Sequence, residues 1–296
     1  MQPFDQIVIS ASRRTDIPAF YMDWFMNRII KGVFETINPY NQQKRTISVD
    51  PGKVHTIVFW SKNFGPFIHG GFGKTLSKMG YHLFFNFTVN SVSSLLEPRL
   101  PPLENRLNQM EELCGQFGGS CINWRFDPIC FFKQNNEAQT RNNLDDFYWI
   151  AEKASQSGIQ RCVTSFMDHY PKIRKRTATV PGFSFVDPTL EQKKEVLLSM
   201  EKTLNAKNIR LFTCCEKTVL ASLPEGSGVM KSSCIPNDFL VEIFGGNLSL
   251  KRDTGQRIKD GCGCMVSVDI GSYRLHPCYH NCLFCYANPA SQKPEQ

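Results

Sequence analysis

Seven short segments rich in Val, Ile, Phe and Thr alternate with longer polar or amphipathic segments along this chain of 296 residues. We predict strands at 6–12, 55–60, 81–89, 121–126, 160–166, 209–214 and 264–270. Helices are predicted between them at 19–31, 102–117, 140–157 and 188–206. This alternation predicts an α/β fold with a parallel sheet, and its length favours a TIM-like (β/α) barrel over a doubly wound open sheet.

Polar side chains collect where the predicted strands end. In a parallel barrel the active site lies at this carboxyl edge, and charges gathered there cost free energy unless partners or a ligand compensate them. Each residue taken alone is equally explained as a turn residue or a buried ion pair. As a group we predict catalytic roles for Arg125, Asp127 and Asp168, and cofactor binding by Ser12, Arg13, Arg14, Asp16, Lys62 and Asn86.

Three cysteines near the C-terminus, Cys278, Cys282 and Cys285, have the spacing C-x3-C-x2-C. Three thiolates on one short loop suit three corners of a [4Fe–4S] cluster and leave the fourth iron open to a ligand. Zinc is the alternative, with further ligands from upstream cysteines. The N-terminus lacks the basic and apolar regions of a signal peptide, so we expect a cytoplasmic protein without a disulfide framework. No apolar stretch approaches the roughly 18 residues that a membrane span needs, and no membrane partner is expected.

The run PCYHNCLFCYA at 277–287 resembles the cluster motif of radical S-adenosylmethionine enzymes, and most of all the spore photoproduct lyase-type subgroup. The resemblance implies that S-adenosylmethionine binds at the open iron and is cleaved reductively to a 5′-deoxyadenosyl radical. It also implies an electron donor such as flavodoxin or ferredoxin. The substrate, a small molecule or a nucleic acid, stays open. The alternatives are a zinc-binding hydrolase or nucleic-acid-binding protein, and a non-catalytic iron–sulfur electron carrier.

Radical enzymes of this superfamily usually carry the cluster loop after the first strand, whereas here the chain ends shortly after Cys285. We therefore expect a circularly permuted barrel, complete or incomplete, whose last strand brings the loop beside the first strand. Residues 1–208 would form the main body, and 209–296 the last strands with the Cys-rich cluster-binding segment, within one structural domain. Arg13 and Asp16 would then face the cysteines, in place of a Gly-rich motif, and contact the carboxylate and amine of the cofactor.

A second set of cysteines, Cys214, Cys234, Cys262 and Cys264, is predicted to form a closed site. Four thiolates suit either an auxiliary [4Fe–4S] cluster or a structural zinc. Cys215 is left out, because it points to the opposite face if the strand ending at Cys214 continues. The remaining cysteines, Cys114, Cys121, Cys130 and Cys162, are predicted to be small buried hydrophobic residues.

The segments SASRRTDIPAFY at 10–21, FWSKN at 59–63 and WRFDP at 124–128 resemble a bacterial domain-of-unknown-function family over essentially the whole chain. The resemblance implies a common fold and brings no reaction with it. The basic run 172–177 is predicted to be a solvated loop, with a phosphate contact or a lid over the barrel mouth as the alternative. The formal net charge of +7 favours anionic partners only mildly and does not identify a nucleic-acid binder.

Overall fold

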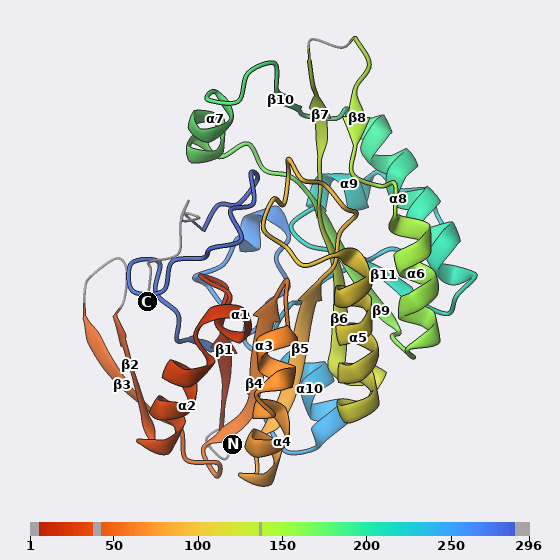
Figure 1. The fold of residues 1–296 in the computed structure, drawn as a ribbon. Coiled ribbons are helices and arrows are strands. Elements are labelled where there is room, and N and C mark those ends of the chain that lie inside the picture. Colours follow the sequence, from red (N-terminus) through yellow and green to blue (C-terminus); the bar gives the residue numbers. More distant parts are fainter. Residues whose placement is uncertain (1–5, 38–42, 136–137, 288–296) are drawn as a thin grey trace.

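A computed structural model describes residues 6–37, 43–135 and 138–287 and is built around one parallel sheet of eight strands (Figure 1). The sheet has the spatial order β12-β11-β9-β6-β5-β4-β1-β13. Its strands are β1 (Ile7–Ala11), β4 (Val54–Ser61), β5 (His82–Thr88), β6 (Ile122–Ile129), β9 (Arg161–Phe166), β11 (Arg210–Thr213), β12 (Met230–Lys231) and β13 (Val268–Asp269). All seven predicted strands are present, and residues on both sides of position 208 contribute to the same sheet.

The last strand lies beside the first. In register, Ile9 of β1 faces Val268 of β13, and Ser10 faces Asp269. On its other side β1 pairs with β4, again in parallel. From β1 to β12 each strand of the sheet follows its neighbour in sequence order, and β13 returns to the far side of β1. This is the strand order of a barrel that has been opened between β12 and β13.

One face of the sheet is covered by the crossover helices. Side chains on alternate strand positions, such as Ile57, Phe85 and Trp124, join these helices in the largest apolar core. The helices that contribute to this layer are α1 (Ile17–Phe20), α2 (Met22–Ile30), α3 (Gly65–His69), α4 (Phe72–Lys78), α5 (Leu103–Phe117), α6 (Phe147–Gln156), α8 (Leu190–Asn205) and α9 (Lys217–Ala221). The predicted helix 140–157 is shorter than expected, because Arg141–Asn142 forms strand β8 and Asp146 is the N-cap of α6.

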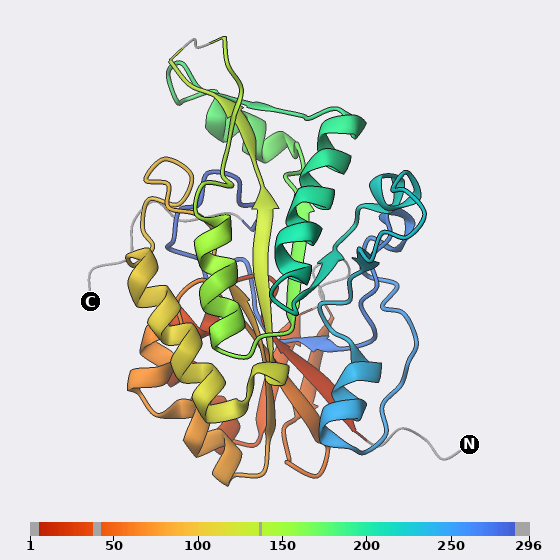
Figure 2. The same ribbon diagram turned by 90° about the vertical axis from the view of Figure 1, so that its right-hand side faces the viewer.

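The opposite face is filled by α10 (Asn237–Phe244), as Figure 2 shows with α5 and α6 on the other side of the sheet. Leu240 of α10 is fully buried against Val8, Val58 and Phe84 from three neighbouring strands. A closed barrel fills this space with side chains from its opposite wall. Here the helix takes that space, the two edge strands are only two residues long, and the described part of the sheet stays open. The closed form of the expected barrel is therefore not found.

Smaller elements extend from the sheet at both ends. The hairpin of β2 (Val33–Ile37) and β3 (Lys44–Ser48) follows α2 and was not predicted. Strands β7 (Phe131–Lys133), β8 and β10 (Ser184–Val186) form a second small sheet above the carboxyl edge, next to α7 (Pro171–Thr177) (Figure 1). The basic run 172–177 thus lies in a helix and not in the predicted loop. No helix in the described ranges is long and apolar enough to cross a bilayer.

Candidate functional site

Asp269 joins the last strand of the sheet, β13, to the first strand, β1, at the carboxyl edge of the sheet. Its carboxylate accepts hydrogen bonds from the hydroxyls of Ser10 (3.0 Å) and Ser12 (2.6 Å). It also accepts from the backbone N–H groups of Arg13 (2.8 Å) and Gly271 (3.0 Å). Four donors around one carboxylate fix the end of β13 against the end of β1. The residues after Asp269 therefore start their course beside the segment that follows β1.

Asp16 connects this junction to the C-terminal cysteine loop. Its Oδ1 accepts from the N–H of Ala19 at 2.9 Å and so caps α1. Its Oδ2 accepts from the Ser61 hydroxyl and the Lys62 N–H, both at 2.9 Å, and lies 2.7 Å from Nε2 of His280. His280 stands between Cys278 and Cys282, so the loop is held directly against the ends of β1 and β4. The Nδ1 atom of His280 is buried and has no hydrogen-bond partner.

Cys278, Cys282 and Cys285 lie in this loop, with Cys282 buried and the other two half-buried. Burial raises the pKa of Cys278 to about 12, and it also raises the pKa of Cys282 and of Cys285. Lys62 acts in the opposite direction on all three thiols and stabilises their thiolate forms. Arg176 of α7 donates to the backbone carbonyls of Leu283 (2.8 Å), Cys285 (3.0 Å) and Cys282 (3.3 Å).

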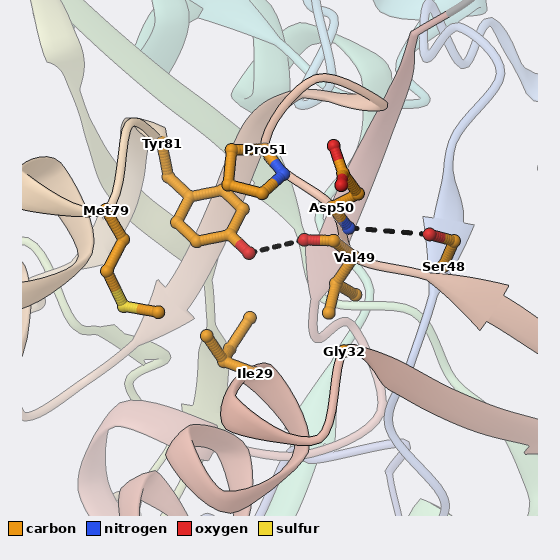
Figure 3. A pocket seen from close by; sticks show the side chains of 8 residues that line it. All are labelled: Ile29, Gly32, Ser48, Val49, Asp50, Pro51, Met79 and Tyr81. Carbon is orange, nitrogen blue, oxygen red and sulfur yellow. Dashed lines mark hydrogen bonds between the residues drawn. The ribbon is translucent and has the colours of Figure 1, made fainter.

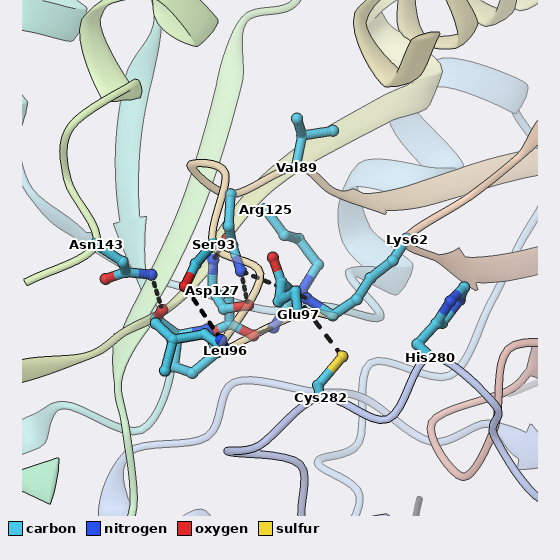
Figure 4. A network of polar contacts seen from close by, with 12 residues as sticks. Lys62, Val89, Ser93, Leu96, Glu97, Arg125, Asp127, Asn143, His280 and Cys282 are labelled. Carbon is cyan, nitrogen blue, oxygen red and sulfur yellow. Dashed lines mark hydrogen bonds and ion pairs between the residues drawn. The ribbon is translucent and has the colours of Figure 1, made fainter. Parts of the chain in front are cut away.

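A polar network adjoins the loop at the ends of β4, β5 and β6 (Figure 4). The Lys62 ammonium lies 2.5 Å from Oε1 of Glu97, and the same oxygen is 4.0 Å from the sulfur of Cys282. The Glu97 carboxylate raises the pKa of Lys62 although burial acts to lower it. Asn90 links Glu97 to the backbone of Asp127, which in turn forms an ion pair of 2.5 Å with Arg125. Burial opposes the ionisation of Asp127, but its pKa is lowered by the Arg125 guanidinium.

The remaining predicted residues lie at different distances from the loop. Arg14 donates to the carbonyl of Gly271 at 2.9 Å, next to the junction of β1 and β13. Asn86 lies deeper in the sheet, where it donates to the carbonyl of Cys234 at 3.0 Å. Asp168 pairs with Arg257 at 2.6 Å, and about half of each side chain is exposed. The structure therefore gathers Ser12, Arg14, Asp16 and Lys62 around the loop and its junction, with Arg125 and Asp127 joined through the network. The backbone of Arg13 also lies at this junction, but its guanidinium contacts Ser267 and Asp253, and Asp168 belongs to a separate ion pair.

The second cysteine set also comes together, although its members come from three separate segments. The sulfur of Cys214 lies 4.0 Å from that of Cys234, and Cys262 is in side-chain contact with both Cys214 and Cys264. The expectation that Cys215 points away from Cys214 was wrong: the sulfurs of the two residues lie 3.7 Å apart. The reason is local, because β11 ends at Thr213 and Cys215 has a left-handed backbone with φ of 61°. The alternation of a strand does not extend to these two residues.

The four other cysteines, Cys114, Cys121, Cys130 and Cys162, are buried free thiols, as predicted. Among the residues that the structure describes, no three or more His, Cys, Asp or Glu side chains are already arranged as a site for a metal ion. A pocket of about 500 Å³ lies beside the β2–β3 hairpin and is lined by residues such as Val49, Pro51 and Tyr81 (Figure 3). These residues precede β4 and β5, so the pocket is at the amino edge of the sheet, away from both cysteine sets.

Three contact residues were not singled out as site residues in the sequence. Glu97 lies in a loop beyond β5, Arg176 lies in the basic run, and His280 lies between two cysteines. Only His280 has a local signal, its place inside the motif. The contacts of Glu97 and Arg176 depend on how distant segments fold together, and one sequence does not contain that information.

Comparisons with known proteins identify the family of this chain. No curated protein matches the chain. A family model described as a domain of unknown function (DUF1848) matches residues 8–287, which include the segment after β1 and the C-terminal cysteine loop. Because the match spans nearly all of its residues, the chain belongs to the DUF1848 family.

Proposed function

We propose that this protein is an iron–sulfur enzyme of the radical S-adenosylmethionine type, with its cluster on the C-terminal loop. The observation that carries the proposal is the position of that loop. Cys278, Cys282 and Cys285 follow the last strand, and His280 ties them to Asp16 at the carboxyl end of the first. In parallel α/β folds ligands bind at this edge of the sheet.

The residues of the loop fit a cluster with three thiolate ligands. Cys278, Cys282 and Cys285 would hold it, and three thiolates leave one metal position for a further ligand. Lys62 offsets the negative charge of the thiolates. The buried Nδ1 of His280, which lacks a partner, is available for a hydrogen bond to a group bound inside the loop. A buried polar atom without a partner costs free energy, and a bound group at this point would remove that cost.

Such a cluster, if bound and reduced, would supply the electron for cleavage of S-adenosylmethionine to methionine and a 5′-deoxyadenosyl radical. The chain itself holds the loop in place and surrounds it with fixed charges. Asp16 and Arg176 fix the loop from opposite sides, through His280 and through three backbone carbonyls. The apolar cluster of Leu96, Phe183 and Phe284 packs around Cys282 and limits the access of water.

The positions of the predicted cofactor-binding residues indicate which of them would contact the cofactor, and the role of one residue, Asp16, is revised. Asp16 accepts four hydrogen bonds from the protein itself, so we assign it to positioning and not to the amine of the cofactor. Arg13 and Arg14 remain candidates for the carboxylate of the cofactor, with Ser12 beside them. Arg125 and Asp127, connected to Lys62 through Asn90 and Glu97, are the candidates for contact with the substrate. Asn86 and Asp168 lie outside this group.

The test is anaerobic reconstitution with iron and sulfide, followed by reduction in the presence of S-adenosylmethionine. We expect 5′-deoxyadenosine as a product, formed by the parent protein and not by Cys282→Ser. Cys130→Ser is the matched control, because Cys130 is buried in the same apolar cluster but stands outside the motif. A brown protein that never forms 5′-deoxyadenosine would be an electron carrier, and a colourless protein that binds only zinc would favour a hydrolase or a nucleic-acid binder. Either result would overturn the proposal.

A further inference from the structure

Four cysteine side chains on the inner side of the sheet form a closed ring of contacts. Cys214 contacts Cys234 and Cys262, and Cys264 contacts the same two residues from the other side. Cys215 contacts Cys214 and Cys262, so it adjoins one side of the ring. The four cysteines pack with Val163, Phe212 and Trp60 in a small cluster of their own.

The ring lies across the place where the sheet is open. Cys214 follows β11, Cys234 follows β12 on one edge, and Cys262 and Cys264 precede β13 on the other edge. Backbone contacts show how close these segments are. Met265 donates to the carbonyl of Ile235 at 3.1 Å, and a Cβ atom placed on Gly263 would lie 2.2 Å from the carbonyl oxygen of Ser232. Only glycine permits this approach, so the glycine of the C-x-C pair brings its two cysteines against the opposite edge.

Two guanidinium groups stand next to the ring. Arg125 donates to the sulfur of Cys234 at 2.7 Å, and Arg13 is close enough to Cys264 and Cys234 for their charges to interact. Both lie over the ring of Trp60, at 5.3 Å and 5.6 Å from its centroid. Positive charge here stabilises thiolates over thiols. A metal ion held by four thiolates carries a net charge of about −2 if the ion is divalent, and the two arginines complement that charge.

We infer that Cys214, Cys234, Cys262 and Cys264 bind a single divalent metal ion of the zinc type in a closed tetrahedral thiolate site. Zinc–sulfur bonds of about 2.3 Å place the sulfurs of such a site about 3.8 Å apart. Within the proposed set, the sulfur of Cys214 already lies 4.0 Å from that of Cys234. In a [4Fe–4S] cluster each thiolate binds a different iron, so the sulfurs lie farther apart than the edge of one tetrahedron. This separation therefore favours one metal ion over the auxiliary cluster.

In their present form the four residues are free thiols that touch in pairs. To surround one ion they must lose protons and turn their sulfurs toward a common centre. A cysteine side chain has a single heavy-atom torsion, so rotation about this torsion is the movement by which each sulfur would turn toward the ion. The bound ion would connect the two open edges of the sheet, where strand pairing is missing. Structural zinc sites contribute to folding in this way.

The first experiment measures metal in the full-length chain with Cys278, Cys282 and Cys285 all changed to Ser. This variant removes the C-terminal site, so its result does not depend on the proposed function. We expect about one zinc per chain. Titration with Co²⁺ should end at about one equivalent, with the absorption of a tetrahedral cobalt thiolate. A brown protein with several irons and no zinc would overturn the inference in favour of a cluster, and a chain that binds no metal would overturn it outright.

The second experiment tests whether the ligands are the four ring cysteines and not the adjacent Cys215. In the same background, Cys264→Ser should reduce bound zinc to less than about a tenth, because three thiolates leave the site open. Cys215→Ser is the matched control, since it removes a contacting thiol that lies outside the ring, and it should keep the full equivalent. Cobalt absorption reports the number of thiolate ligands in both variants, even where the fold is weakened. Loss of metal from Cys215→Ser together with full retention by Cys264→Ser would contradict this ligand set.

Discussion

Asp16 shows how one carboxylate joins segments that are far apart in the sequence. It caps α1, holds the turn after β4 through Ser61 and Lys62, and binds His280 in the cysteine loop. The sequence predicted Asp16 as a site residue because it follows a predicted strand, and the structure brings it into contact with His280 of the cysteine loop. Its role as an acceptor for a cofactor amine could not be separated from a structural role, since three of its four partners lie 45 to 264 residues away. The orientation of Cys215 was predicted wrongly for a related reason. The residue at which β11 ends depends on the strands that pair with it, and these are distant in the sequence.

Asp16→Asn should destabilise the protein and loosen the loop. The amide keeps the size of the side chain but replaces one of the two acceptor oxygens by an NH2 donor. The donors of Ala19 on one oxygen and of Ser61, Lys62 and His280 on the other can then no longer all be satisfied. We expect a loss of about 1–3 kcal/mol in the free energy of unfolding. Urea denaturation measures it, with the exposed Asp23→Asn as control, which should change stability by less than about 0.5 kcal/mol. Equal effects of the two changes would show that the hydrogen bonds of Asp16 do not stabilise the fold.

Arg176→Ala should loosen the cysteine loop without unfolding the sheet. The guanidinium donates to three backbone carbonyls of the loop, and removing it takes this donor away from all three, although the carbonyl of Cys282 keeps the hydrogen bond from the N–H of Cys285. Amide hydrogen exchange over residues 280–287 should become about tenfold faster, corresponding to about 1.4 kcal/mol. Arg174→Ala on the same helix removes an exposed arginine and should leave this exchange unchanged. Unaltered protection in Arg176→Ala would mean that other contacts hold the loop.

At the scale of elements, the predicted strands were found because most of them are buried on both faces. Segments such as Val54–Ser61 then read as continuous apolar runs. The strand β12 is only two residues long and has no such pattern. The β2–β3 hairpin does alternate, with Phe34 and Ile47 buried, and this pattern was overlooked. The position of α10 could not be predicted, because its burial depends on three strands that precede it by more than 150 residues.

Asp269→Asn should release β13 from β1. The carboxylate accepts four hydrogen bonds at this junction, whereas the strand pairing itself covers only two residue pairs. We expect faster hydrogen exchange in residues 264–272, by roughly tenfold or more, with the exchange of β5 unchanged. Asp260→Asn, at an exposed carboxylate just before this segment, is the control. If both variants exchange alike, the backbone pairing alone holds the strand.

The contact between α10 and the sheet should depend on pH. His82 stacks on Phe244 at 4.6 Å, and burial, with a further contribution from His55, lowers its pKa from 6.5. Since the folded protein resists protonation, stability is full above about pH 6.5 and falls as the pH decreases below this value. Urea denaturation at about pH 7.5 and about pH 5.5 should show a smaller decrease for His82→Gln than for the parent. The same decrease in both would assign the pH dependence to other groups.

At the scale of the whole molecule, the opening of the sheet explains where the chemistry-bearing residues gather. The chain returns from β12 to β13 across the open edges, and this return carries α10 and three of the four ring cysteines. The loop beyond β13 carries the other set and reaches the end of β1. The spacing of its cysteines singled out the C-terminal set in the sequence, whereas only the C-x-C pair of the second set has a local pattern. The adjacency of the first and last strands was expected from the resemblance to radical enzymes and is confirmed. The open edge of the sheet could not be predicted from the sequence, because closure of a barrel depends on which elements fill the inner face of its sheet.

The role of the C-terminal loop is tested most directly by iron analysis and electron paramagnetic resonance of the reduced, reconstituted protein, with and without S-adenosylmethionine. The parent should hold about four irons per chain, together with about one zinc in the cysteine ring. Its resonance should change when S-adenosylmethionine is added. In Cys282→Ser the iron signal should be lost while the zinc remains. An unchanged, S-adenosylmethionine-sensitive signal in Cys282→Ser would contradict the assignment of the cluster to this loop.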